Sequence, residues 1–235
     1  MSLVPQTAST LTLESYRALC ERYSGLFAAN KAEQQRLVDD LSEISKHLQR
    51  QVERLRRQKS NKEDIQGQAY AEGFSIVHRQ LQMCIEDIQH NQLSFIEPVE
   101  PGDLQNAYED LQDDYETAER QIQHQKRKAF LEVLQVHDAF TRLISGEINN
   151  VSMRSILKLF AGTDDALIGA LSRCTVNVAV SQRGQPPDLA LCEIVGTAGQ
   201  ITTDEWVVIQ ELTPAYMLNG KLLRKASVIL GTKGS

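Results

Sequence analysis

One uninterrupted helical stretch, from Asp103 to Ile144, constrains this sequence more than any other feature. Pro101 and Gly102 precede it and interrupt any earlier helix, while Asp103 offers a side-chain oxygen for the N-cap. No Gly or Pro follows until Gly146. Apolar and aromatic side chains recur in its first half at alternating spacings of four and three residues: Leu104, Tyr108, Leu111, Tyr115, Ala118 and Ile122. This spacing is typical of a coiled-coil seam and predicts a helix about 60 Å long.

The apolar stripe of this stretch widens beyond Ala129. The wider face comprises Phe130, Leu131, Val133, Leu134, Val136, Phe140, Leu143 and Ile144. Such a face is typical of a helix in a multi-helix bundle rather than of one in a two-helix coil. A small domain cannot bury so long a helix, so we expect it to pair with another helix. We also expect it to enter a bundle at its C-terminal end.

The composition changes near residues 172–175, where we place the main domain boundary. The first 145 residues are rich in Gln, Glu, Arg, Lys and Leu, whereas Val, Thr, Gly and Pro gather after Thr175. This shift predicts an α+β protein in which helices precede a β-rich part. The expected order is a disordered N-terminus (1–10), a helical and coiled-coil region (11–102), the long helix with a dimerisation bundle (103–174), a small β domain (175–230) and a tail (231–235).

Three helices are predicted before the long one. They run from Leu11 to Phe27, from about Asn30 onward, and from residue 64 to residue 92, with Gly25 near the end of the first. The second has its own seam, at Leu37, Leu41, Ile44, Leu48 and Leu55. After the long helix, the segments 151–160 and 164–171 have helical spacing and are separated at Gly162. We expect these two short helices to fold back on the wide apolar face and complete the bundle.

After Cys174 the spacing of apolar residues changes from the helical period to alternation. Val176, Val178 and Val180 alternate with smaller or polar residues, as in a half-buried strand. Further strands are predicted at 189–195, 206–212 and 221–230, and Asn219-Gly220 is a strong signal for a hairpin turn. We expect a small antiparallel sheet, which is too small to be very stable unless it packs on the helices.

The composition argues against several functional classes. A net charge of −6 argues against a dedicated nucleic-acid binder. No apolar run approaches the roughly 18 residues that cross a bilayer, and the N-terminus lacks the charged and apolar segments of a signal peptide. The cysteines at 20, 84, 174 and 192 are far apart in the sequence, which favours reduced thiols over disulfides. We expect a soluble, cytoplasmic protein that binds neither nucleic acid nor membranes.

The sequence contains no recognisable catalytic or cofactor-binding motif. It has no phosphate-binding GxxxxGKS or GxxxxGKT, no GxGxxG after a strand, and no GxSxG around a nucleophile. All of its histidines lie in predicted helices, and none has metal-ligand spacing. Because adjacent helical residues diverge by about 100°, His137 and Asp138 should not face each other, and we interpret His137 as a partly buried bundle residue. We therefore expect a binding protein without metal or cofactor, not an enzyme.

Two separate stretches carry a longer pattern. The first is LQVHDAFTRLI, from Leu134 to Ile144, and the second is YMLNGKLLRKASV, from Tyr216 to Val228. They resemble the motifs L-x-V-x-D-x-hydrophobic-x-R-A-L and G-Y-x-L-N-G-R-x-x-R-x-A-x-V of the GrpE family, the nucleotide exchange factors of DnaK-type heat-shock chaperones. The two stretches occur in the family's order, and the resemblance covers about residues 103–230.

The resemblance implies a homodimer of paired helices that presents a β-wing to the nucleotide-binding domain of a DnaK-type chaperone. Wing contacts would favour the open nucleotide cleft and, by linkage, weaken ADP binding. The partner-binding residues that it implies are Tyr216, Leu218, Asn219, Gly220, Arg224, Ala226 and Val228, to which we add Ile194 and Trp206 as apolar wing surface. The dimerisation residues are Leu104, Tyr108, Leu111, Tyr115, Ile122, Leu134 and Phe140.

The chain departs from the family pattern at two places in the β region. Ala215 stands where the family has Gly, at a position that would use glycine's backbone freedom. The family's F-D-P-x-x-H-x-A segment is reduced to residues 185–189, which contain no His. These departures keep a second interpretation open: a dimeric coiled-coil adaptor or scaffold that has the fold but has lost exchange activity.

A fainter match lies in the N-terminal helices. LRRQ at residues 55–58, followed by Ala69 and Phe74, looks like the family's stalk pattern L-R-R-R…A-x-x-x-F. Two explanations are open. The match is either an internal echo of the later helices or the true stalk, interrupted by an insertion.

Overall fold

The protein is α+β, as the sequence predicted. The computed structural model describes residues 12–58, 65–98, 102–144, 151–179, 182–198 and 206–232. The helices are α1 (Leu13–Gln58), α2 (Ile65–His90), α3 (Leu104–Ile144) and α4 (Val151–Arg173). The strands are β1 (Val176–Val178), β2 (Cys192–Thr197), β3 (Trp206–Thr213), β4 (Tyr216–Leu218), β5 (Lys221–Arg224) and β6 (Ala226–Thr232). The N-terminus predicted to be disordered (1–10) and the turn after the long helix lie outside the described residues.

The long helix α3 begins as its sequence predicted. The Asp103 carboxylate accepts hydrogen bonds from the backbone N–H groups of Gln105 (3.1 Å) and Asn106 (3.4 Å), which is the geometry of an N-cap. With 41 residues, α3 is about 60 Å long at the usual helical rise.

The first helix, α1, is continuous where the sequence predicted two helices. Gly25 lies inside it, and a single Gly weakens a helix by only about 1 kcal/mol relative to Ala. On either side of Gly25, the rings of Tyr23 and Phe27 pack edge to face with their centroids 5.2 Å apart. The prediction of a break was therefore wrong, because tertiary packing outweighs one weak position. In the same way, α4 continues through Gly162.

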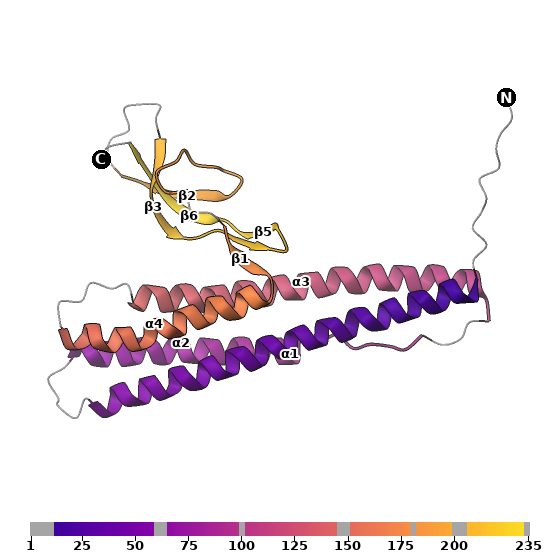
Figure 1. Cartoon of the computed structure of the whole chain (residues 1–235), viewed down its shortest axis with the longest axis horizontal. Helices are drawn as coiled ribbons and strands as arrows, with labels where there is room; N and C mark the ends of the chain where they lie inside the picture. Colours follow the sequence, from indigo (N-terminus) through magenta and orange to yellow (C-terminus); the bar gives the residue numbers. More distant parts are fainter. Residues whose placement is uncertain are drawn as a thin grey trace.

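The four helices form two hairpins that lie side by side (Figure 1). α1 and α2 run in opposite directions, as do α3 and α4, whereas the long helices α1 and α3 run in the same direction. The short helices cover only the C-terminal parts of the long ones. The molecule is thus a four-helix bundle at one end and a two-helix stalk, made by α1 and α3, at the other.

The side chains predicted to form a dimer seam face other helices of the same chain. They are Leu104, Tyr108, Leu111, Tyr115, Ile122, Leu134 and Phe140. Those in the stalk pack with Tyr16, Leu19 and Tyr23 of α1. Leu134 and Phe140, in the bundle, join a core shared by all four helices, and Ile122, between the two groups in sequence, is buried. The long helix therefore has the helical partner that its spacing predicted, but the partner belongs to the same chain.

The strands form two three-stranded sheets, together called the wing below, rather than one antiparallel sheet. The first sheet, β1-β4-β5, is antiparallel throughout, and the second has the order β2-β6-β3. In the second sheet, β2 pairs with β6 in parallel, which the sequence did not predict. Side chains alternate with a period of two in both kinds of pairing, so the sequence pattern cannot distinguish them. The predicted strand 221–230 is also divided, at Lys225, into β5 and β6.

The turn predicted at Asn219-Gly220 is present and joins β4 to β5. Both residues have positive φ, 50° and 75°, as a two-residue type I′ hairpin requires. The turn is also tied to the helical part, because the Asn219 N–H donates to the carbonyl of Thr175 (3.3 Å). The Asn219 side-chain oxygen lies 2.6 Å from the Thr175 hydroxyl.

Two glycines should respond in opposite directions to the same substitution. Neither a Cβ at Gly25 nor one at Gly220 would meet any atom within 4 Å, so only the backbone distinguishes them. We expect Gly25→Ala to stabilise the protein by about 0.5–1 kcal/mol and Gly220→Ala to destabilise it by about 1–2 kcal/mol. Urea denaturation followed by circular dichroism checks both. Equal effects of the same sign would contradict the backbone assignment of the turn.

Candidate functional site

The predicted partner-binding residues are divided between the interior and the surface of the wing. The buried ones are Tyr216, Ala226 and Val228. The half-buried ones are Trp206, Leu218 and Arg224, and the exposed ones are Ile194, Asn219 and Gly220. Buried side chains cannot touch another protein in this conformation, so the first group shapes the wing from within. The half-buried and exposed residues can contact a partner directly.

An ion pair braces the wing against the long helix. The guanidinium of Arg224, at the end of β5, donates two hydrogen bonds to the carboxylate of Asp138 on α3 (2.5 and 3.1 Å). Arg224 also lies over the ring of Tyr216, 5.0 Å from its centroid. Both charged side chains are largely removed from solvent, at 21% and 17% exposure. A two-pronged pair of this kind fixes orientation as well as distance, so it sets how the wing stands on the bundle.

Asp138 and Arg224 come from the two stretches that carry the GrpE-like motifs. Asp138 is the acidic residue of the first, and Arg224 is the second arginine position of the other. The sequence placed Arg224 among the partner contacts, whereas the structure turns it toward the helix. Nothing in a single sequence indicates that two distant motif residues pair with each other.

A second arginine, which the sequence analysis did not single out, also attaches the wing. Arg127 of α3 donates to the backbone carbonyls of Leu222 (3.2 Å) and Leu223 (2.9 Å) in β5. Arg127 lies about three turns before Asp138 on the same helix, so the two attachments hold the middle of β5, at Leu222 and Leu223, and its last residue, Arg224. The wing is therefore fixed to α3 at two points.

His137 lies buried next to the brace, between two carboxylates. Its Nε2 is 3.1 Å from an Asp164 oxygen and its Nδ1 is 3.6 Å from an Asp138 oxygen, so the prediction that His137 and Asp138 do not face each other was wrong. Burial alone lowers the pKa of His137, but the hydrogen bonds and negative charges of Asp138 and Asp164 outweigh it and raise the pKa to about 9. His137 is thus a charged structural residue at neutral pH. The pKa of Asp138 is lowered, because His137 and Arg224 outweigh its burial.

The stability of the protein should fall as pH rises from 6 to 8.5. A folded-state pKa above the unfolded value of 6.5 gives His137 a contribution that is complete below pH 6.5 and lost as pH rises through about 9. Thermal melts at pH 6.0, 7.0, 7.75 and 8.5 measure the slope. His137→Gln should flatten the slope in this window, and an unchanged slope in the variant would assign the effect to other groups.

Apolar side chains are exposed along and just before β2, which is an edge strand of its sheet. Leu189 is 60% exposed, Ile194 45% and Val195 52%. An exposed apolar cluster on a protein surface commonly marks a contact with another protein. Of the three, only Ile194 was predicted to contact a partner. Leu189 and Val195 lie in a predicted strand, where alternation alone does not show which face another element covers.

A polar cleft of about 530 Å³ separates the β4–β5 hairpin from α3. It is lined by Glu119, Arg120, Gln123 and Arg127 of α3 and by Leu218, Asn219, Lys221 and Leu222 of the hairpin. Two predicted partner-binding residues, Leu218 and Asn219, are therefore on its wall. Three of its lining side chains are cationic and one is anionic, and one of the cations, Arg127, is already bonded to the carbonyls of Leu222 and Leu223.

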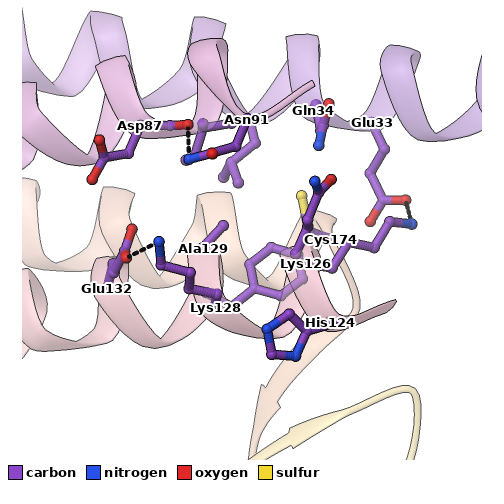
Figure 2. Close-up of a pocket in the computed structure, with 14 residues that line it drawn as sticks. Glu33, Gln34, Asp87, Asn91, His124, Lys126, Lys128, Ala129, Glu132 and Cys174 are labelled. Atoms are coloured by element: carbon purple, nitrogen blue, oxygen red, sulfur yellow. Dashed lines mark hydrogen bonds and ion pairs between the residues drawn. The ribbon is translucent and has the colours of Figure 1, made fainter. Parts of the chain in front are cut away.

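A more apolar hollow of about 220 Å³ lies in the helical part, where the bundle opens into the stalk (Figure 2). Its apolar lining includes Leu37, Ile88, Phe130 and Cys174. The lysines at its rim are already engaged in ion pairs, Lys126 with Glu33 (2.5 Å) and Lys128 with Glu132 (3.7 Å). This arrangement is that of a gap at the end of a helical bundle, not of a reaction centre.

The described residues offer no chemical centre of another kind. They contain no cluster of three or more His, Cys, Asp or Glu that could hold a metal ion. All four cysteines are free, and burial raises the pKa of the Cys84 and Cys174 thiols to about 11, which makes them poor nucleophiles near neutral pH. None of the described helices is long and apolar enough to cross a membrane.

The departure at Ala215 leaves the wing intact. Ala215 is buried in the core of the second sheet, and it is not among the described residues with positive φ. The position therefore does not require glycine in this chain. The shortened segment 185–189 contains no side chain that replaces the missing His.

Comparison with known proteins gives one match. The family model described as GrpE matches residues 99–232, which is more than half of the 235-residue chain. No curated protein and no solved structure matches. The matched range includes α3, α4 and the whole described part of the wing, and it leaves out α1 and α2.

Proposed function

Because this chain belongs to the GrpE family, we propose that it binds the nucleotide-binding domain of a DnaK-type chaperone and promotes the release of ADP. The observation that carries this proposal is the brace between Asp138 and Arg224, which joins the two family motifs and fixes the wing on the long helix. An exchange factor must hold a flexible partner in one conformation. A wing fixed at two points to a rigid bundle meets that requirement.

The mechanism follows from linkage. If the wing binds the open form of the nucleotide cleft more tightly than the closed form, its binding shifts the chaperone toward the open form. ADP, which prefers the closed form, then binds more weakly by the same factor. The protein thus needs no catalytic side chain, and it acts as a co-chaperone rather than as an enzyme.

We propose that the chaperone contacts the exposed edge of the wing. The contact consists of Leu189 just before β2 and of Ile194 and Val195 within it, with Asn219 and Gly220 at the hairpin tip. Half-buried Trp206 and Leu218 extend this surface. Tyr216, Ala226 and Val228 support it from the core, and Arg224 orients it. We place this action in the cytoplasm, where the expected partner is a DnaK-type chaperone.

A charge placed on this edge should weaken chaperone binding without unfolding the wing. We expect Ile194→Asp to lower the affinity about tenfold or more, since an apolar anchor at an interface is typically worth more than 1 kcal/mol. Met83→Asp is the matched control, because Met83 is 58% exposed on α2, away from the wing. Calorimetric titration of a chaperone nucleotide-binding domain measures both. Equal affinities of the two variants would remove β2 from the contact.

The nucleotide dependence of binding tests the proposed function. The protein should bind a nucleotide-free chaperone domain at least tenfold more tightly than the same domain saturated with ADP. The reciprocal titration should show ADP affinity reduced by the same factor in the presence of the protein. Equal affinity for the two nucleotide states would show that the protein does not promote exchange.

The missing His segment favours a second candidate function, that of an adaptor or scaffold with the family fold but without exchange activity. Such a protein would bind its partner equally well in all nucleotide states, or would bind no DnaK-type chaperone at all. The same titrations therefore separate the two functions.

A further inference from the structure

The two helical hairpins are built to the same plan. In each, a long helix (46 residues in α1, 41 in α3) is followed after six residues by a short one (26 in α2, 23 in α4). The long helices end at residues 58 and 144, and the short helices begin at residues 65 and 151. The difference in numbering is 86 in both cases, so the two hairpins align in sequence without an insertion or a deletion.

The buried positions of the short helices coincide under this offset of 86. In α2 they include Phe74, Val77, Leu81, Cys84, Ile85 and Ile88. Their equivalents are Phe160, Thr163, Leu167, Ala170, Leu171 and Cys174, and all of these are buried too. In the long helices, buried Ile44, Leu48 and Gln51 correspond to buried Phe130, Leu134 and His137. The short helices thus present the same face to the bundle core, and the long helices share three of their buried positions.

One pair of equivalent residues marks the symmetry of the bundle. Phe74 and Phe160 stack face to face, with their centroids 3.9 Å apart and their planes at 2°. A residue can stack on its own equivalent in this way only next to a two-fold axis. The stalk follows the two-fold symmetry less closely. Tyr23 there contacts Tyr115, whereas its equivalent at the offset of 86 is Glu109.

We infer that the α1–α2 hairpin is an internal second copy of the α3–α4 hairpin, which completes the bundle within one chain, so that the protein works as a monomer with a single wing. The seam of α3 is already covered by α1 in the stalk and by α1 and α2 in the bundle. A second chain therefore has no free seam to occupy. This inference stands on geometry alone and does not rest on the proposed function.

The connection between the hairpins is long enough for this arrangement within one chain. The end of α2 lies beside Glu33 and Leu37 of α1, and α3 begins beside Tyr16 and Leu19. The chain must therefore return along the stalk by roughly 30 Å, at 1.5 Å of rise per residue. The 13 residues 91–103 can span about 43 Å when extended. Phe95 anchors this segment, 5.5 Å from the rings of Tyr23 and of Phe27.

The α1–α2 hairpin lacks the groups that hold a wing. At the positions equivalent to Arg127, Asp138 and Asp164 stand Leu41, Val52 and His78. Leu41 and Val52 are buried apolar residues. Leu41 cannot donate to backbone carbonyls as Arg127 does, and Val52 cannot form an ion pair with an arginine as Asp138 does. The internal copy therefore has the buried residues that form the bundle core, and it lacks the polar residues that attach a wing.

Sedimentation equilibrium of the full chain from 1 to 100 μM tests the inference. The expected result is a single species at the monomer mass of 26.4 kDa across the range. A species of twice that mass would overturn it, whether the dimer forms through a new surface or by exchange of hairpins.

A cross-linking experiment locates the pairing of α1 and α3. Light and heavy isotope-labelled chains are unfolded, mixed, refolded and treated with a carbodiimide, which joins Lys126 to Glu33 as an amide and is itself hydrated to a urea. Cross-linked peptides should be light–light or heavy–heavy, and mixed pairs at about half of the total would overturn the inference. Failure to bind any chaperone would instead count against the proposed function and would leave the monomer mass unaffected.

Discussion

Asp138→Ala should weaken the attachment of the wing by about 3 kcal/mol, because it leaves the largely buried guanidinium of Arg224 without its carboxylate. The same substitution removes one of the two carboxylates that hold His137. We expect the amides of β5 to exchange with deuterium at least tenfold faster, while those of the α2 core change little. In a chaperone assay the variant should lose most of its acceleration of ADP release. A loosened wing must become ordered when it binds, and this entropy cost weakens its binding to the chaperone.

Two controls distinguish the loss of the Asp138–Arg224 ion pair from the loss of a negative charge on α3. Glu132→Ala breaks a partly exposed ion pair on the same helix (3.7 Å, with Lys128 60% and Glu132 25% exposed) and should change stability by less than about 1 kcal/mol. The double variant Asp138→Leu, Arg224→Met leaves no buried charge unpaired and should recover part of the lost stability. If Asp138→Ala leaves the exchange of β5 amides unchanged, the ion pair does not hold the wing.

Phe160→Ala should destabilise the bundle by about 3–5 kcal/mol, the usual range for removing a fully buried aromatic ring. Phe160 is 0% exposed and contacts both Phe74 and Phe140, so the substitution opens a cavity at the centre of the core. Urea denaturation followed by helical circular dichroism gives the free energy of unfolding. Ile76→Ala on α2, at a side chain 56% exposed, is the surface control and should stay within about 0.5 kcal/mol.

The stacked rings should also be coupled. If Phe74 and Phe160 stabilise each other across the axis, Phe74→Ala and Phe160→Ala together should differ from the sum of the single effects by about 0.5–1.5 kcal/mol. Additive effects would mean that the two rings lie in independent parts of the core.

The parts of the fold that the sequence predicted depend on local interactions. The cap at Asp103, the seam of α3 and the turn at Asn219-Gly220 each involve residues a few positions apart, and each is present. The parts of the fold that the sequence did not predict depend on interactions between residues that are far apart in the chain. Gly25 remains helical because of packing around it, and β2 pairs in parallel with a strand about 35 residues further on, at Val228 beside Ile194.

The candidate site was predicted in part for the same reason. The two motif stretches pointed to Asp138 and Arg224, but only the fold brings these residues together. Arg127 carried no signal in the sequence, because its partners are backbone carbonyls, which any residue provides. The long helix was expected to need a partner, and the sequence could not show that α1 supplies it. Of the faint stalk match, only Phe74 has an identical equivalent at the offset of 86, Phe160, whereas LRRQ corresponds to TRLI at residues 141–144.

The most direct test of the proposed function is stopped-flow release of a fluorescent ADP analogue from a DnaK-type chaperone. The wild-type chain should accelerate release at least tenfold, with a rate that saturates as its concentration rises. Asp138→Ala should show a much smaller acceleration, and Glu132→Ala should match the wild type. A release rate that stays at its unstimulated value at saturating wild-type protein, across the chaperones of its own cell, would contradict the account.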